Sequence, residues 1–386
     1  MPKTIAITPS WYWPAGIPRV MGVPPFSVYD LCVARPARDR PDDLAVVAGD
    51  QRLTFMELKD AVDRAAAAVA ERSAGARGGA AISPRVDIES AFLLLGALAA
   101  GIPLRLVPPG GNLAAVAESV GATVLEGMNG SAGPAAAKRF ARDELQQPAV
   151  TVDGVEGPVH HSHRSLLAMA ISLSTYFDAG RRPWLVTLPP WRWEGLVSLL
   201  TPLYLGAPAV LLPEQANEAA LAEIIAREEV GYAFHELEPA AYATREAKKE
   251  VKQARGLLEG FLLSVHGIFD SDQRRRVARG FECPALTVFG LPETGPIFAA
   301  HPSWYLDESV GTPMTNAHVV PAEPRTGAPI PTLWELVESA EVTLSSPSLM
   351  CGYERDAYRD RFVDGRYRTK MMASSDPNGM IYLLGE

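Results

Sequence analysis

The chain has 386 residues and a formal net charge of −9. This length exceeds one ordinary hydrophobic core and predicts two or three packed subdomains. An acidic chain with no long basic run is a poor partner for nucleic acid or anionic membranes, and the basic stretch 245–255 is interleaved with Glu246 and Glu250, as on a solvated helix face.

Strand and helix patterns alternate through the first part of the chain. An extended arm is predicted over 1–24, a helix over 27–35 and a hairpin over 45–53. Thr54 and Glu57 form a capping box at the start of the next helix. Further strands and helices then alternate, which predicts a parallel sheet covered by helices. These elements are strands at 80–83, 102–107 and 123–125 and helices at 88–100 and 113–120.

A second alternating series follows, and the pattern changes again near residue 303. The second series consists of strands at 184–188, 208–212, 231–234, 262–266 and 285–289 and helices at 194–205 and 219–228. After residue 303, short β-like runs lie between turns at 340–344, 366–369 and 380–384. The predicted fold class is α/β, with two stacked subdomains of mainly parallel sheets and a small β-barrel-like subdomain. The predicted boundaries are 1–183, 184–302 and 303–386.

The sequence carries no sign of export or of a membrane span. Its three cysteines lie far apart without CxxC spacing, which predicts neither a zinc site nor a disulfide framework. The N-terminus lacks the apolar region of a secretory signal. The longest apolar run, 91–104, is shorter than the roughly 18 residues that a span requires. We therefore expect a cytoplasmic protein.

Eight segments follow one another along the chain as recognisable motifs. They are RLTFMELKDAVDRAAAAVAE (52–71), IESAFLLLGALAAGIPLRLVPP (88–109), LLTPLYLGAPAVLLP (199–213), VFGLPETGP (288–296), SVGTPM (309–314), SPSLMCGYE (346–354), FVDGRYRT (362–369) and DPNGMIYLLGE (376–386). In this order they resemble motifs of the adenylate-forming superfamily, the AMP-dependent synthetases and ligases that include acyl-CoA synthetases. The resemblance runs from about residue 26 to the end and implies the N-terminal domain of that fold. We expect the C-terminal lid domain to be absent, since the chain stops where the lid would begin.

The resemblance implies ATP, magnesium and CoA as ligands, but its nucleotide motifs are altered. The family loop TSGTTGxPKG reads VTVDGVEG at 150–157, without the lysine and with Asp153 and Glu156. Carboxylates beside a triphosphate are repulsive. The family motif YRTGD reads YRTKM at 367–371, so Lys370 replaces glycine and Met371 replaces the ribose-binding aspartate. A methionine cannot accept the two hydroxyl hydrogen bonds.

Some nucleotide-site positions keep the residue type of the family. VFGLPETGP retains the acidic residue as Glu293, which in the family supports magnesium and nucleotide, and Thr294 follows it. His163 lies in VHHSHRSLL, where the family commonly has histidine without metal. We therefore interpret the neighbouring histidines as packing at a helix start and predict no metal site.

The acyl pocket of the family suggests a further group of candidates. The family motif PxFHxxG reads PPWRWEG at 189–195, with Arg192 in place of the histidine. A guanidinium there pairs with a carboxylate or phosphate of a ligand, or alternatively stacks on a tryptophan and points to solvent. The acyl-pocket candidates by position are Trp191, Arg192, Trp193, His266, Gly267, Phe289 and Gly290.

Three functions remain open from these residues, and whether the chain is an enzyme is one of the open points. The first is a diverged protein that binds an acyl or aryl carboxylate or thioester without adenylating it alone. The second is an active ligase or acyl-transfer enzyme that uses a lid domain in trans or a pre-activated acyl donor. The third is a non-catalytic partner of a true synthetase. The expected partners are a small carboxylic acid or acyl thioester, and a carrier protein, a separate lid or synthetase subunit, or a second copy of the chain.

Overall fold

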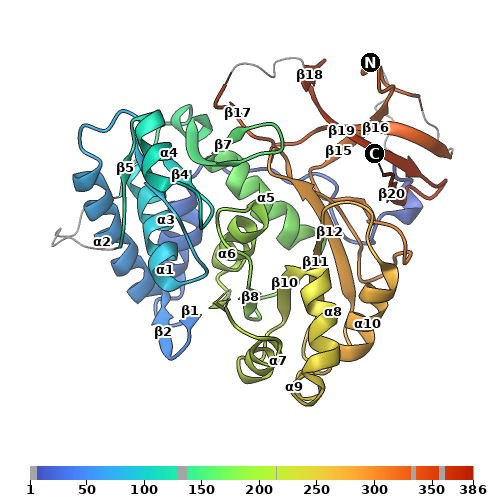
Figure 1. Ribbon diagram of the computed structural model, residues 1–386, viewed down its shortest axis with the longest axis horizontal. Helices are drawn as coiled ribbons and strands as arrows, with labels where there is room; N and C mark the ends of the chain where they lie inside the picture. The colour runs from blue at the N-terminus through green and yellow to red at the C-terminus, as the bar shows by residue number, and fades with distance from the viewer. Residues whose placement is uncertain (1–6, 128–136, 214, 332–335, 356–360, 386) are drawn as a thin grey trace.

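The computed structural model describes residues 7–127, 137–213, 215–331, 336–355 and 361–385. Three groups of elements follow one another along the chain (Figure 1). The blue and teal elements lie to the left, the green to orange elements fill the lower centre and right, and the red strands lie at the upper right. The predicted α/β class, with two helix-covered sheets and a β-rich third group, is confirmed.

The first group is built on a sheet with six strands among the described residues, in the order β17-β7-β6-β4-β3-β5. The strands β3 to β6 pair in parallel, whereas β7 pairs antiparallel with both β6 and β17. The strand bounds are β3 (Ala80–Ile82), β4 (Leu104–Leu106), β5 (Thr123–Val124), β6 (Pro148–Asp153), β7 (Pro158–Ser162) and β17 (Gly352–Tyr353). The helices of this group are α1 (Arg35–Asp39), α2 (Phe55–Arg72), α3 (Ile88–Ala100), α4 (Leu113–Val120) and α5 (His163–Tyr176).

Local signals explain why several helices have the bounds that the sequence predicts. Thr54 and Glu57 form the expected capping box at the start of α2. Asp87 accepts a hydrogen bond from the backbone N–H of Ser90 at the start of α3, and Gly101 ends that helix in the left-handed conformation with φ of 69°. The predicted helix at 27–35 is present: the chain is helical from residue 28, its middle turn Asp30–Ala34 is π-helical, and it continues into α1.

The second group is built on a sheet with nine strands among the described residues, in the order β14-β13-β12-β11-β10-β8-β9-β1-β2. Its central pairs are parallel, and the pairs at both edges are antiparallel. The strand bounds are β1 (Leu44–Ala48), β2 (Gln51–Thr54), β8 (Trp184–Val186), β9 (Ala209–Leu211), β10 (Tyr232–Glu236), β11 (Gly260–Val265), β12 (Ala285–Leu291), β13 (Gly295–Ala299) and β14 (Thr312–Pro313). The helices are α6 (Trp193–Leu205), α7 (Glu218–Arg227), α8 (Leu237–Glu246), α9 (Lys248–Gln253) and α10 (Ser271–Phe281).

The sheets cross the predicted boundaries at two points. The hairpin β1–β2, inside the predicted unit 1–183, pairs with β9 and so extends the second sheet. Strand β17, from the predicted unit 303–386, pairs with β7 and extends the first sheet. A strand inside a sheet forms backbone hydrogen bonds along both edges, and the neighbouring sequence does not specify which distant strand supplies the second partner.

The third group is a strongly paired antiparallel sheet. Its strands run in the order β15-β16-β19-β18, with β20 also paired to β19. The bounds are β15 (His318–Ala322), β16 (Val337–Ser345), β18 (Phe362–Val363), β19 (Arg366–Ser375) and β20 (Ile381–Leu383). The arm before β1 contains one short 3-10 turn, Ser10–Tyr12. Across the part of the chain that the structure describes, every helix is too short or too polar to cross a membrane.

Candidate functional site

The acyl-pocket candidates lie at the carboxyl ends of the parallel strands of the second sheet. Residues 187–195 follow β8, and residues 266–270 follow β11. Parallel strands present their carboxyl ends at one edge of the sheet, and ligands of open α/β sheets bind there. Two hollows open at this edge, with volumes of about 330 and 730 Å³.

Arg192 is the centre of a polar cluster at this edge. It occupies the N-cap position of α6. Its Nη2 lies 3.0 Å from Glu194 Oε1 and 2.9 Å from His266 Nε2, and its Nη1 pairs with Glu236. Burial acts to lower the pKa of Arg192, but Glu194 and Glu236 outweigh it and raise that pKa above its ordinary value. The guanidinium is therefore committed to two carboxylates of the protein.

Glu194 is buried and accepts a second hydrogen bond. Only 1% of it is exposed, and Ser264 Oγ donates to its Oε1 at 2.9 Å. His235 lies beside this cluster and forms a hydrogen bond with Thr187 Oγ1 at 2.8 Å. Burial lowers the pKa of His235 to about 4, so its ring is neutral at neutral pH. One guanidinium between two carboxylates leaves the cluster with a net negative charge.

The two hollows share Glu236 and two other residues but otherwise have different walls. The smaller is lined by Trp191 and Arg192 together with His235 and apolar residues that follow β9 or belong to α7. The larger is lined by His266 and by residues of α8 and α10. Trp191 is partly buried, and its Nε1 has no hydrogen-bond partner among the described residues. Trp191, Arg192 and His266 are therefore the sequence candidates that border open space.

The remaining acyl-pocket candidates lie differently. Trp193 and Phe289 are buried in the core, 2% and 1% exposed, and Phe289 stacks on Phe298. A Cβ at Gly290 would lie 2.9 Å from the Trp193 ring and 2.2 Å from the carbonyl oxygen of Gly295, so the glycine permits this close packing. A Cβ at Gly267 would meet no atom within 4 Å. None of these four residues lines either hollow.

The altered nucleotide loop is the turn between β6 and β7, two strands that the sequence pattern did not predict. Both carboxylates of this turn are paired with cations of the protein. Asp153 pairs with Arg105, whose side chain is 9% exposed. Glu156 accepts from Arg361 Nε at 2.7 Å and from Lys370 Nζ at 3.3 Å. The charges that were expected to repel phosphate therefore hold the turn against the rest of the protein.

Glu293 also contacts this turn. Its Oε1 accepts a hydrogen bond from the backbone N–H of Val155 at 2.8 Å and a longer one from the Tyr353 hydroxyl. Its Oε2 is buried and has no partner among the described residues. Burial raises the pKa of Glu293 despite these hydrogen bonds. The donor set fits a magnesium ion poorly, because Glu293 belongs to no group of three or more His, Cys, Asp or Glu side chains among the described residues that could hold a metal ion.

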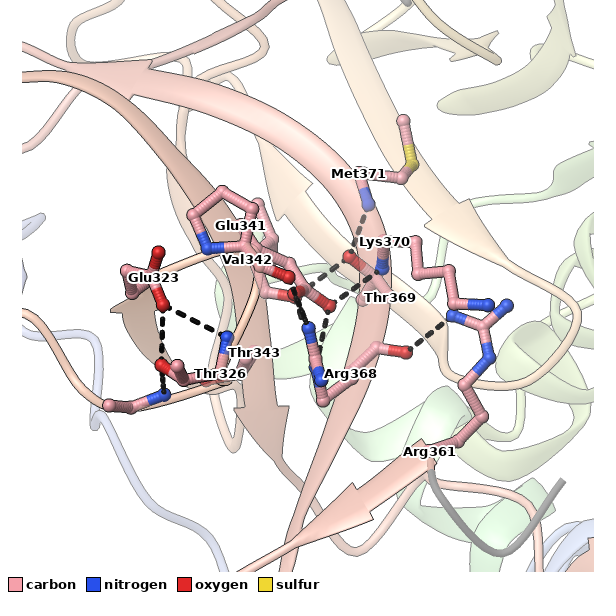
Figure 2. A network of polar contacts seen from close by, with 12 residues as sticks. Glu323, Thr326, Glu341, Val342, Thr343, Arg361, Arg368, Thr369, Lys370 and Met371 are labelled. Carbon is pink, nitrogen blue, oxygen red and sulfur yellow. Dashed lines mark hydrogen bonds and ion pairs between the residues drawn. The ribbon is translucent and has the colours of Figure 1, made fainter.

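The segment in place of YRTGD forms a bulge in β19. Figure 2 shows Glu341 between Arg368 and the backbone of Lys370. Glu341 is 2% exposed, pairs with Arg368 and accepts from the Lys370 N–H at 3.1 Å. Lys370 has φ of 60°, a conformation that glycine adopts more easily. Lys370 thus adopts the backbone conformation for which the family motif has glycine, and its side chain reaches Glu156. At the next position Met371 has a thioether in place of a carboxylate.

The three histidines near the start of α5 have partners within the protein. His160 forms a hydrogen bond with Thr151, and His161 donates to the carbonyl oxygen of Pro292. His163 Nδ1 accepts from the Val28 N–H at 3.2 Å. Burial lowers the pKa values of His161 and His163 to about 4. Thr294, the remaining nucleotide-site candidate, is fully buried and donates to its neighbour's carbonyl oxygen.

Sequence reasoning missed several charged partners of the site. Glu194 stands two residues after Arg192, so the motif itself contained that signal. Glu236 and Arg361 are distant in sequence from their partners, and no local pattern indicates the pairs. Ser264 and His235 lie inside or at the end of buried strands, where polar residues signal a functional strand end.

Comparisons with known proteins agree with the geometry of the fold. The family model described as AMP-binding enzyme matches residues 157–354. The unliganded o-succinylbenzoate coenzyme A synthetase from Bacillus subtilis is similar in structure, with a TM-score of 0.79 and 19% identity over 92% of this chain and 79% of that chain. MatB from Rhodopseudomonas palustris has a TM-score of 0.79 and 18% identity over 93% of this chain and 79% of that chain.

A third similar structure is the nonribosomal peptide synthetase FmoA3, with a TM-score of 0.80 and 23% identity over 97% of this chain and 44% of that chain. At these identities the likeness shows the fold alone. No curated protein matches the sequence.

Proposed function

The chain belongs to the AMP-binding enzyme family, and from that premise we propose that it binds an acyl or aryl group and does not adenylate a carboxylate by itself. The observation that carries this proposal is the state of the nucleotide loop. Glu156 is bound by Arg361 and Lys370, and Asp153 by Arg105, so cations that a phosphate would need are already neutralised. Met371 removes the ribose acceptor as well.

The polar cluster at the strand ends favours one form of the ligand. The proposed acyl site lies beside Trp191, with Arg192 at its mouth. Because Arg192 is neutralised by Glu194 and Glu236, a free carboxylate would meet net negative charge. The acyl end of a thioester carries no formal charge, whereas the acyl end of a free acid is a carboxylate. We therefore favour an acyl or aryl thioester, as carried by CoA or a carrier protein, over the free acid.

The first test is carboxylate-dependent exchange of pyrophosphate into ATP by the full chain, with an active acyl-CoA synthetase as positive control. We expect no exchange above a heat-inactivated sample and an ATP dissociation constant no tighter than about 1 mM, because micromolar binding requires about 8 kcal/mol. Exchange by the chain alone would favour an active ligase. Exchange only after a separate lid domain is added would favour catalysis in trans.

The second test separates the two ligand forms by thermal shift. We expect octanoyl-N-acetylcysteamine, a neutral thioester, to raise the melting temperature more than octanoate at equal concentration. A ligand at 100 times its dissociation constant adds about 2.7 kcal/mol of stability, which is a readily measured shift. Trp191→Ala should remove the shift caused by the thioester. A thioester shift that persists unchanged in Trp191→Ala would refute this position of the acyl site.

A further inference from the structure

A third hollow lies between the N-terminal arm and the β-rich group. Its volume is about 660 Å³, and it shares no lining residue with the two hollows described above. Residues 7–23 form one wall, residues 313–319 and 345–349 form others, and Arg164 at the start of α5 borders it. Its lining is mostly apolar, and its volume lies within the range of sites for small ligands.

Hydrogen bonds hold the arm in place over this cavity. Arg19 stacks on the Trp13 ring, with 4.7 Å between its Cζ and the ring centroid, and its Nη2 donates to the carbonyl oxygens of Thr8 and Pro9. The Asn316 N–H donates to the carbonyl oxygen of Arg19. The Met21 N–H donates to Asn316 Oδ1. These contacts fix the arm as one wall of the cavity, so the cavity is present without a ligand.

The charge of the cavity is opposite to that of the whole chain. The chain has a net charge of −9, yet among the described residues no aspartate or glutamate lines this cavity. Arg19 and Arg164 both line it, and neither has a carboxylate partner among the described residues. Burial lowers the pKa of Arg19 from its ordinary value. A cavity with two uncompensated guanidinium groups attracts an anion.

Two further polar groups of the lining are left without partners. Asn316 is 7% exposed, and its Nδ2 has no hydrogen-bond partner within the described part of the chain. The same holds for the buried Nε2 of His318. Unsatisfied buried nitrogens are costly in a folded protein, and in a native structure each calls for an explanation. Both nitrogens are shielded from the open cavity, so the two arginines, and not these nitrogens, remain the donors available to a ligand.

We propose that the cavity under the N-terminal arm is a binding site for a small carboxylate with an apolar body, such as a medium-chain or aromatic acid. The apolar body lies against the Trp13, Met314 and Val319 side of the lining, and the carboxylate takes the fork of Arg164. This site is separate from the proposed acyl site, where net negative charge disfavours a free acid. The two sites are thus selective for different forms of related ligands.

Isothermal titration calorimetry of the full chain with octanoate and octanamide tests the proposal, because the two probes differ in charge at equal size. We expect octanoate to bind more tightly than octanamide. Arg164→Gln should raise the octanoate dissociation constant about three- to tenfold, as for loss of a charge-assisted hydrogen bond near the surface, and leave octanamide unaffected. Arg77→Gln is the matched control, since Arg77 is also exposed and has no ion pair among the described residues.

Trp191→Ala separates this proposal from the acyl site. Octanoate binding should survive Trp191→Ala, because Trp191 does not line this cavity. The proposal is overturned by equal binding of octanoate and octanamide, by an octanoate affinity that Arg164→Gln leaves unchanged, or by no binding at millimolar octanoate. A loss of octanoate binding in Trp191→Ala alone would assign the acid to the acyl site and overturn it equally.

Discussion

At the level of single residues, the ion pairs of the nucleotide loop differ in how far they are shielded from water. Arg361 has 4% of its side chain exposed, Glu156 has 22% and Lys370 has 58%. An exposed ion pair contributes little because water screens it, whereas a shielded charge that loses its partner is strongly unfavourable. The contribution of Glu156 to the stability of the fold therefore comes mainly from its ion pair with Arg361.

This difference predicts unequal effects of two charge-removing substitutions. Glu156→Gln should lower the free energy of unfolding by about 2 kcal/mol or more, because it leaves the Arg361 guanidinium buried without a counter-ion. Lys370→Met should lower it by less than about 1 kcal/mol. Urea denaturation of the unmodified protein and of the two variants measures both losses in the free energy of unfolding. Equal losses in the two variants would show that the Arg361 pair is not the main contact.

At the level of elements, the start of α6 depends on one glycine. Gly195 lies in the first turn of the helix, directly against the segment that leads into it. A Cβ at this position would lie 2.0 Å from the carbonyl oxygen of Pro189, and that oxygen belongs to the backbone and cannot rotate away. The glycine allows the loop that carries Trp191 and Arg192 to fold back on the helix.

Gly195→Ala should therefore destabilise the protein, although alanine ordinarily stabilises a helix by up to about 1 kcal/mol relative to glycine. We expect a loss of at least about 1–3 kcal/mol, as for overpacking of a close contact, and a weaker thioester-induced thermal shift. Gly267→Ala is the control, because its Cβ would meet nothing within 4 Å. Matching melting temperatures of Gly195→Ala and the unmodified protein would contradict this account.

At the level of the whole molecule, buried histidines couple folding to pH. His161, His163 and His235 have pKa values lowered to about 4 by burial, whereas an unfolded histidine titrates near 6.5. The unfolded chain therefore binds more protons between these values. Each histidine contributes stability that is present above pH 6.5 and is lost as the pH falls. Glu293 acts in the opposite direction, because its pKa is raised.

We predict that the free energy of unfolding decreases as the pH falls from about 6.5 to about 4. Each of the three histidines adds a slope of up to about 1.4 kcal/mol per pH unit. His163→Gln keeps an acceptor for the Val28 N–H and should make the pH dependence shallower. Denaturant titrations of both proteins at several pH values test this, and identical slopes would refute it.

Local sequence signals predicted much of the secondary structure. The bounds of α3 and α4 match the prediction because an N-cap side chain and a left-handed glycine mark each end. The hairpin β6–β7 was not predicted, since the segment 150–157 was interpreted only as a loop. Of the candidate site, Trp191, Arg192 and His266 border open hollows, and the partners of Arg192 were not visible in its local pattern.

The sequence by itself determined the α/β class, the order of the elements that it predicted, and the residues at 150–157 and 367–371 that differ from the family motifs. Periodicity, caps and residue identity are local properties, so one sequence is enough to read them. Only the tertiary structure decided that Glu156 is neutralised by Arg361, that Arg192 is held between two carboxylates, and that the arm closes over a cavity lined by arginines. Electrostatic effects depend on distance and burial in space, and residues far apart in the chain supply both.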